Sequence, residues 1–283
     1  MKVASRGMSV ADRIKTHPRP ARLVLSRVLW ASRLCGLLPL SVELPEGIRV
    51  RFHPTAMSAT MWLDPAFSSV DRALLGAYLQ PGDTFVDVGA NVGVLSLAAG
   101  RRVGSGGLVL SLEAHPRTYR YLIANITLNG MSWVRPHCLA AGPRRGRVRM
   151  TDLRSDDQNH LLPSPNLEGV SVEMAPLDAV VPGDREVAML KLDVEGFELP
   201  VLEGARSVLA RTACIYFECW ERHCRRFGYG ASDLFAALEE SGFGLFRWDA
   251  AGGLTEADAP SRECENFLAI RDHLDFSRRM GTS

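Results

Sequence analysis

The stretch with the clearest chemical potential joins an apolar strand to a glycine-containing loop, and it reads TFVDVGANVG from Thr84 to Gly93. Glycines let a chain turn tightly and let a ligand approach the backbone, while exposed N–H groups at the start of a helix bind polar or anionic groups. Glu113 closes the next predicted strand, 20 residues after Gly93. An acid in that position can accept hydrogen bonds from both hydroxyls of a ribose. The pattern therefore predicts a nucleoside-bearing cofactor.

The spacing of the glycines narrows the choice of cofactor. The dinucleotide pattern G-x-G-x-x-G, aligned on Gly89, needs glycine at positions 91 and 94, but the chain has Asn91 and Val94 there. No P-loop lysine follows, so NAD and nucleoside triphosphates are both disfavoured. Asp87 precedes a G-x-x-x-G spacing, which suits a cofactor with an amino-acid tail whose ammonium can meet a carboxylate. The residues indicate S-adenosylmethionine, and the alternative is a glycine turn in an inert α/β domain.

A second block, KLDVEGFE, places charges where an apolar strand ends. Charges in a buried parallel strand are costly unless they lie at its carboxyl end, where such sheets place their sites. In extended geometry Lys191, Asp193 and Glu195 face the same way. Glu218 ends the next predicted strand and would project into the same crevice. Ionisable groups that converge in this way perturb one another's pKa, as catalytic groups do; a structural Lys–carboxylate network is the alternative.

These groups need a scaffold, and the chain supplies an alternating strand–helix rhythm that predicts a parallel sheet covered by helices. Residues 41–61 read as extended around a turn at 45–47. Helices are predicted at 67–79, 92–101, 117–129, 198–210 and 232–241, and strands at 84–88, 108–113, 133–139, 187–193, 213–218, 243–248 and 266–270. The rhythm breaks at about 142–174, which predicts an inserted hairpin or lid of the kind that often carries specificity.

The amino-acid composition and the net charge exclude several classes of protein. The 283 residues are 46% hydrophobic and 23% charged, which excludes disordered and collagen-like chains, and the net charge of +1 argues against a polyanion binder. Residues 1–40 hold eight basic groups and one acid, so a basic leader of +7 precedes a domain, 41–283, of −6. Residues 23–37 of this leader could form a helix that packs on the domain, which we favour, or lies on an anionic membrane.

Six cysteines without a CxxC pair exclude zinc-ribbon and thioredoxin motifs, and free thiols favour a reducing cytoplasm. No run of apolar residues is long enough to span a membrane, and arginines interrupt the apolar stretch that could serve as a signal peptide. We therefore expect a cytoplasmic protein.

Several motifs together resemble the FkbM family of S-adenosylmethionine-dependent methyltransferases over about residues 82–270. They are Asp-Val-Gly-Ala-Asn-Val-Gly at 87–93, Glu-Ala-His-Pro at 113–116 and, most specifically, Lys-Leu-Asp-Val-Glu-Gly-Phe-Glu at 191–198. The resemblance implies an α/β fold, a Rossmann-like seven-stranded sheet that is mostly parallel with an antiparallel last strand. It also implies O-methylation of a hydroxyl on a small-molecule acceptor of the polyketide, sugar or glycan type. The leader and the insertion lie outside the shared motifs.

The resemblance also assigns roles to particular positions. The methionine part of the cofactor would be held by Asp87, Gly89, Ala90, Asn91 and Gly93. Glu113 would hold the ribose, His115 and Pro116 would flank the adenine, and Ala140 would lie beside the adenine edge.

Methylation of a hydroxyl also needs a base or a metal, because the pKa of a hydroxyl lies far above 7. Asp193, Glu195 and Glu218, beside Lys191, could act as base or as oxygen ligands of a divalent ion such as Mg²⁺. His160 in the predicted lid is another candidate base. His137 and His223 have no supporting sequence context.

Two further classes of protein stay open. A methyltransferase acting on nitrogen or on nucleic acid usually carries an Asp/Asn-Pro-Pro-aromatic motif after the fourth strand, where this chain has Asp-Val-Glu-Gly at 193–196. The acidic domain argues against nucleic acid as a partner. A non-catalytic S-adenosylmethionine-binding module of the same fold is the other alternative.

Overall fold

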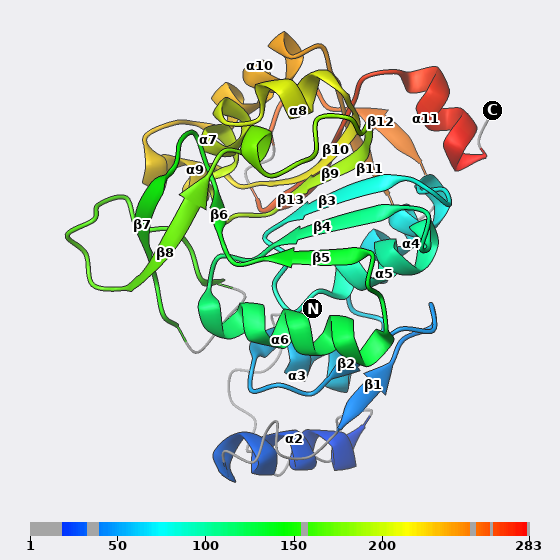
Figure 1. The fold of residues 1–283 in the computed structure, drawn as a ribbon, viewed down its shortest axis with the longest axis vertical. Coiled ribbons are helices and arrows are strands. Elements are labelled where there is room, and N and C mark those ends of the chain that lie inside the picture. Colours follow the sequence, from blue (N-terminus) through cyan, green and yellow to red (C-terminus); the bar gives the residue numbers. More distant parts are fainter. Residues whose placement is uncertain (1–18, 33–39, 154–157, 250–252, 261–262, 282–283) are drawn as a thin grey trace.

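The computed structural model describes residues 19–32, 40–153, 158–249, 253–260 and 263–281, and its centre is an eight-stranded sheet (Figure 1). The strand order is β12-β11-β13-β10-β9-β3-β4-β5. The bounds are β3 Thr84–Val88, β4 Leu108–Leu112, β5 Val134–His137, β9 Val187–Leu192, β10 Thr212–Cys219, β11 Gly244–Trp248, β12 Leu254–Glu256 and β13 Glu265–Ile270.

Five neighbouring strands, β5, β4, β3, β9 and β10, run parallel. The last strand of the chain, β13, lies antiparallel between β10 and β11, so the predicted Rossmann-like arrangement is confirmed. The predicted count of seven is wrong by one, because β12 extends the edge as an antiparallel neighbour of β11. Its three residues have no buried face, so they lack the alternation that identifies a strand in sequence.

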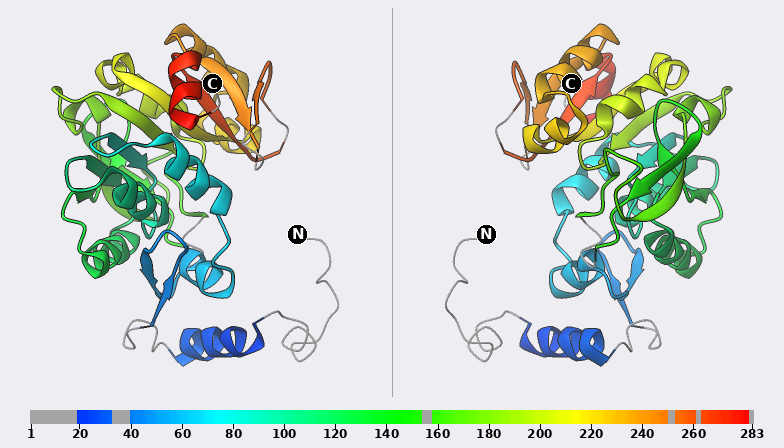
Figure 2. Two further views of the ribbon diagram at one scale, coloured as in Figure 1. Left: turned by 90° about the vertical axis from the view of Figure 1, so that its right-hand side faces the viewer. Right: turned by 90° about the vertical axis from the view of Figure 1, so that its left-hand side faces the viewer.

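Helices cover both faces of the sheet (Figure 2). One face carries α4 Ser69–Tyr78, α5 Val94–Val103, α6 Pro116–Asn129 and α11 His273–Met280. The opposite face carries α7 Glu198–Glu203, α8 Arg206–Ala210 and α10 Ala231–Glu240, with the short helices η2 Leu177–Ala179, α9 Glu221–Cys224 and η3 Arg225–Phe227 nearby. The single helix predicted at 198–210 is thus two helices, which meet where Gly204 packs against the carbonyl oxygen of Gly142.

The segment before the sheet forms a hairpin and a helix. Strands β1 Ser41–Glu43 and β2 Arg49–Arg51 pair antiparallel around the predicted turn. The predicted extended run to residue 61 is wrong beyond residue 55, because α3 spans Ala56–Leu63 and the Thr55 side chain caps it by accepting a hydrogen bond from the Ser58 N–H. Such a cap satisfies one of the free N–H groups of the first turn.

Two asparagines of α6 hold the hairpin against the domain. Asn129 Oδ1 accepts from Arg49 N at 2.8 Å, and Asn125 Oδ1 accepts from Arg51 N at 2.9 Å. Because they are four residues apart, the two amides lie on one face of the helix. They accept the N–H groups along the edge of β2 that does not pair with β1.

Helix α2, Pro20–Ser32, contacts α3. Arg22 donates a hydrogen bond to the Trp62 carbonyl at 3.1 Å, and the Trp62 indole N–H donates to the Arg22 carbonyl at 3.2 Å. The other residues of the expected leader, 1–18 and 33–39, lie outside the described residues. Within the described parts of the chain, every helix is too short or too polar to cross a membrane.

The insertion is a small separate sheet beside the main one. Strands β6 Ala140–Ala141, β7 Gly146–Met150 and β8 Val170–Ala175 lie in the order β6-β8-β7. The antiparallel β7–β8 pair is the predicted hairpin. Met150 also forms an isolated bridge with Leu161, which joins the loop between the two strands to the end of β7.

Candidate active site

A cavity of about 340 Å³ lies at the carboxyl ends of β3, β4, β9 and β10. This edge is where open α/β sheets bind their ligands, and the volume falls within the range of ligand pockets. Its walls include both sequence blocks, the end of β4, the insertion and helix α4. The predicted site residues that border it are Asp87, Gly89, Ala90, Asn91, Glu113, Ala140, His160, Lys191, Asp193, Glu195 and Glu218.

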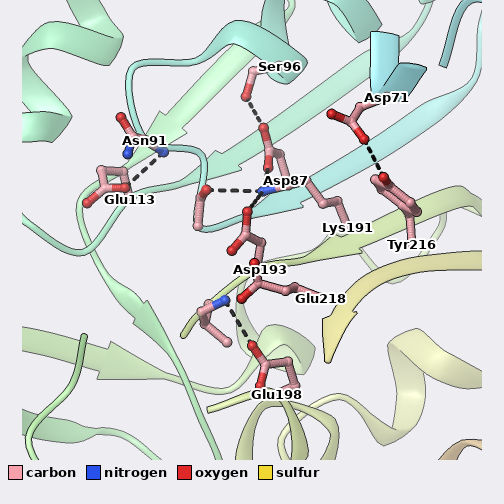
Figure 3. Close-up of polar contacts among 12 residues, drawn as sticks. Asp71, Asp87, Asn91, Ser96, Glu113, Lys191, Asp193, Glu198, Tyr216 and Glu218 are labelled. Atoms are coloured by element: carbon pink, nitrogen blue, oxygen red, sulfur yellow. Dashed lines mark hydrogen bonds and ion pairs between the residues drawn. The ribbon is translucent and has the colours of Figure 1, made fainter. Parts of the chain in front are cut away.

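Polar residues form a row across four adjacent strands. Asp87 pairs in register with Ser111 of β4 on one side and with Lys191 of β9 on the other, and Lys191 pairs with Tyr216 of β10. Ser96 of α5 connects the row from above, because its hydroxyl donates to Asp87 Oδ2 at 2.6 Å (Figure 3). The row lies directly beneath the cavity.

Lys191 is the cation of this row. Its Nζ lies 3.2 Å from Asp87 Oδ1 and 3.3 Å from Asp193 Oδ2, and it donates to the Gly89 carbonyl at 3.2 Å. Burial by itself lowers the pKa of Lys191, but the carboxylates of Asp87 and Asp193 outweigh it and raise the pKa above the ordinary value. Lys191 therefore stays charged and joins the glycine loop to the end of β9.

The backbone N–H groups of the glycine loop are all used within the protein. Gly89 and Ala90 donate to the Leu112 carbonyl, Asn91 donates to Glu113 Oε2, and Gly93 donates to the Ala90 carbonyl. The Val92 N–H donates to the side chain of Asn91. The N–H groups of this loop are therefore not free for a ligand, while the N–H groups predicted to bind one belong to the start of α5, at Val94.

Two glycines of this loop are required by packing. A Cβ at Gly89 would lie 1.8 Å from the Asp193 carbonyl oxygen, and a Cβ at Gly93 would lie 2.5 Å from the Leu122 side chain. Both have positive φ, 84° and 91°, a region that glycine enters without strain. Gly93 does not border the cavity; it is the N-cap residue of α5.

Glu113 reaches the cavity from the end of β4. Its Oε2 accepts the Asn91 N–H at 2.9 Å (Figure 3). Its Oε1 accepts the His115 N–H at 2.8 Å, so backbone groups orient the carboxylate on both sides. His115 and Pro116 do not border the cavity. His115 is buried as the N-cap of α6, with Nε2 3.3 Å from Asp152, and Pro116 is the first residue of that helix. The expected contact of these two residues with adenine is therefore absent from the cavity wall.

Three carboxylates crowd the opposite wall of the cavity. The pKa of Glu195 is raised to about 9, chiefly by burial and then by the nearby carboxyl groups of Glu218 and Asp193. Burial likewise raises the pKa of Glu218 to about 7, with Asp193 as the next cause, while a hydrogen bond from the Cys264 thiol opposes the change. Glu195 is therefore mainly protonated at pH 7, and the three carboxyl groups do not all carry a negative charge there.

The turn after β9 is built to hold Glu195 in this position. Glu195 has a φ of +58°, which is unusual for a residue with a side chain. Buried Glu198 accepts hydrogen bonds from Val194 N and Gly196 N, Tyr229 donates to the Gly196 carbonyl, and Arg226 donates to the Glu195 carbonyl. Such a conformation persists where its surroundings determine it, and it often occurs at functional sites.

His223 is a site residue that sequence reasoning missed. Its Nδ1 lies 3.1 Å from Glu195 Oε2 and 3.8 Å from Glu218 Oε2. Burial and the nearby Arg226 lower the pKa of His223 to about 4, so the ring is neutral at pH 7. A Cβ at Gly196 would lie 2.4 Å from the His223 carbonyl oxygen, and this close approach brings α9 against the turn. No signal in the sequence joins positions 195 and 223.

His160 borders the cavity from the insertion. Thr151 Oγ1 accepts its backbone N–H, and its Nδ1 lies 2.9 Å from the Gln158 carbonyl. Burial lowers the pKa of His160. The predicted lid therefore does bring this histidine to the cavity.

The remaining wall comes from α4 and the segment before it. Tyr216 donates a hydrogen bond to Asp71 of α4 across the cavity floor (Figure 3). Met57, Phe67 and Ser68 also belong to this wall, and Asn266 of β13 borders the cavity next to β10. The alternation of β10 could have identified Tyr216, since it shares the face of Glu218, but Asp71 is 145 residues away and carried no signal.

The antiparallel β13 within a parallel sheet, the cavity at the carboxyl edge, and the acid at the end of β4 define an α/β protein of the Rossmann-like methyltransferase class. A family model described as "Methyltransferase FkbM domain" matches residues 87–245, more than half of the chain. The chain belongs to this family.

Individual relatives are distant. A protein named Methyltransferase 1 from Beauveria bassiana (strain ARSEF 2860) is 29% identical over 148 residues, which span 44% of this chain and 59% of that relative. A SAM-dependent methyltransferase from Aquifex aeolicus matches with 14% identity over 74% of this chain and 94% of its own, at a TM-score of 0.42. Aeropyrum pernix fibrillarin, solved with S-adenosyl-L-methionine, matches with 15% identity over 71% of this chain and 74% of its own, at a TM-score of 0.43.

Proposed function

We propose that the protein is an S-adenosylmethionine-dependent methyltransferase that transfers the methyl group to a hydroxyl of a small molecule. The observation that carries the proposal is that the glycine loop with Glu113 and the Lys191–Glu195 block border one cavity. One block has the groups expected for a nucleoside and an amino-acid tail. The other has the groups expected for proton removal. Membership of a methyltransferase family supports the same reaction.

The cavity fits this cofactor in two respects. Ala114, Leu139 and Ala140 give an apolar wall for adenine next to Glu113. A carboxylate has about four acceptor positions, so the two backbone N–H groups that orient Glu113 are compatible with hydrogen bonds from ribose hydroxyls. Asp87 is fully buried beneath the loop. Its contribution to an ammonium group is therefore electrostatic and is shared with Lys191.

The same loop argues against a dinucleotide. A dinucleotide-binding loop brings its glycines and backbone N–H groups close to the pyrophosphate, whereas the N–H groups of loop residues 89–93 are bound within the protein. A cofactor with a neutral sugar and no phosphate does not need them.

When bound, S-adenosylmethionine supplies a methyl group on a positively charged sulfur, which leaves as a neutral thioether. The protein must orient the acceptor oxygen and take its proton. Asp193 is suited to the second task, because its side chain is 40% exposed at the cavity and is held by Lys191 at 3.3 Å. Tyr216, Asp71 and Asn266 offer hydrogen-bonding groups for a polar acceptor.

The proposal is tested in two steps. Calorimetry on the purified protein should detect binding of S-adenosylmethionine and of its demethylated product, and no binding of NAD. Protein with methyl-labelled cofactor is then incubated with separate pools of hydroxylated metabolites, amines and RNA, and the labelled product is identified by mass spectrometry. Label in the hydroxylated pool supports the proposal. Label only in amines or RNA, or binding of NAD, would overturn it.

A further inference from the structure

Glu195, Glu218 and His223 offer three ligand atoms that lie within 4.8 Å of one another. In the described ranges of the chain no other group of three such side chains meets this spacing. We propose that these three residues bind a divalent transition-metal ion of the zinc and manganese class at the wall of the cavity. The site differs from the magnesium site expected from sequence, because a histidine nitrogen replaces the Asp193 carboxylate.

The geometry suits a small cation. His223 Nδ1 lies 3.1 Å from Glu195 Oε2 and 3.8 Å from Glu218 Oε2. Ligand atoms bonded to zinc at about 2.0–2.2 Å in a tetrahedron are roughly 3.3 Å apart. Small side-chain movements therefore bring the three atoms to bonding distance of one ion.

His223 Nδ1 is prepared to be a ligand. The atom is buried between carboxyl oxygens of Glu195 and Glu218 at 3.1 and 3.8 Å, so it is satisfied only when a proton or a cation lies between them. A buried polar atom without a partner is costly, so its position between two carboxylates calls for an occupant. Either a proton or a metal ion would serve, and only a metal ion would bind the histidine nitrogen and both carboxyl groups at once.

The carboxyl groups around the site also favour a bound cation, because the nearby basic side chains are engaged elsewhere. Glu195 and Glu218 are only 18% and 21% exposed, and Asp193 borders the same cavity. Lys191 is engaged by Asp87 and Asp193, and the guanidinium of Arg226 is directed to the Glu195 carbonyl. A divalent cation would displace the proton that these crowded carboxyl groups hold and would balance the charge of both carboxylates once they bind it.

The donor set determines the class of metal. Magnesium prefers six oxygen ligands, whereas a mixed set of imidazole nitrogen and carboxylate oxygen suits zinc, manganese, iron or cobalt. Glu195 and Glu218 both border the cavity, so an ion between them would have positions open to it. There it would polarise an acceptor hydroxyl and assist loss of its proton. This role rests on the proposed methyl transfer, but binding of the metal does not.

The test uses full-length protein without a histidine tag, stripped of metal with a chelator. Co²⁺ is the probe, because its visible absorption reports nitrogen and oxygen ligands directly. We expect one Co²⁺ per chain, displaced by Zn²⁺ and not by a large excess of Mg²⁺. His223→Gln should weaken Co²⁺ binding at least tenfold, whereas His273→Gln, an exposed histidine on α11, should leave it unchanged.

Thermal melting and calorimetry with S-adenosylmethionine accompany each variant. If His223→Gln melts early, Glu218→Gln takes its place, with exposed Glu240→Gln as its control. Absence of Co²⁺ binding, equal binding by His223→Gln, or displacement by Mg²⁺ would overturn the metal site. Co²⁺ binding without cofactor binding would support the metal site and defeat the proposed function, so the two failures are distinguishable.

Discussion

Lys191 on β9 and Asp87 on β3 lie opposite each other in parallel register, with 3.2 Å between Nζ and Oδ1. The Asp87 side chain is completely buried, and that of Lys191 is 7% exposed. The pair joins the strand that begins the glycine loop to the strand that ends in Asp193. Loss of the pair should therefore both destabilise the domain and disturb the cavity, which both residues border.

Replacing Lys191 with Met should lower the free energy of unfolding by about 3–5 kcal/mol, because it leaves a buried carboxylate without its cation. Urea denaturation measures the change. The double variant Asp87→Asn with Lys191→Met should recover much of the loss. Arg147→Met, which breaks the exposed pair with Glu173, should cost less than about 1 kcal/mol; an equal effect of the two single substitutions would contradict a buried structural pair.

Replacing Glu113 with Gln should weaken binding of S-adenosylmethionine by about 1.5–3 kcal/mol, because charge-assisted hydrogen bonds to ribose are lost. Calorimetry checks this, with a melting curve to confirm that the loop still folds. Glu173→Gln, an exposed acid of β8, is the control and should bind as the parent does. Unchanged affinity in Glu113→Gln would remove this residue from the cofactor site.

Replacing Asp193 with Asn should lower turnover by about 100-fold or more if Asp193 takes the acceptor proton. Stability and cofactor affinity should change little, because Asn keeps the shape and the side chain is 40% exposed. Initial rates are measured with the acceptor found in the labelled pools. If turnover does not change, His160, which borders the same cavity, becomes the candidate base.

Replacing Gly89 with Ala should prevent the approach of the loop to β9, because the added Cβ would lie 1.8 Å from the Asp193 carbonyl oxygen. Gly130→Ala is a matched control, since Gly130 also has a positive φ but has no atom near its Cβ position. The control should cost about 1–2 kcal/mol of backbone strain. The loss for Gly89→Ala should exceed that by several kcal/mol in urea denaturation, and equal losses would show that only φ matters there.

His53 should make stability depend on acidity. Its ring is buried, stacks on Tyr121 and has Nε2 without a partner among the described residues. Burial, with help from Arg51, lowers the pKa of His53 to about 4 from 6.5. Between these values the unfolded chain binds more protons, so the contribution of His53 is fully present above pH 6.5 and is lost as pH falls to about 4.

The expected loss is roughly 3 kcal/mol, at about 1.4 kcal/mol for each pKa unit. Urea denaturation from pH 7 to pH 4 measures it, and the difference between the parent protein and His53→Gln isolates His53 from other groups that titrate in the same range. Parallel pH profiles for the two proteins would contradict a neutral buried imidazole.

Local sequence was sufficient for the elements that carry the cofactor block. The strand Thr84–Val88 has the predicted bounds because all five residues are buried, which produces an uninterrupted run between turn signals. Lys191 and Asp193 face the cavity because alternation along a strand is a local property. Nearby features without a repeating pattern, such as β12 and the break between α7 and α8, were not predictable in this way.

Tertiary structure alone decided which groups meet and which are already bound. Only the fold shows that three N–H groups of the glycine loop are bound by the end of β4, through the Leu112 carbonyl and the Glu113 carboxylate. His223 had no context in the sequence, yet packing of α9 against Gly196 brings it to Glu195. The physical reason is that hydrogen-bond partners and electrostatic neighbours depend on distances between chain segments far apart in sequence, while side-chain alternation depends only on the backbone of the segment itself.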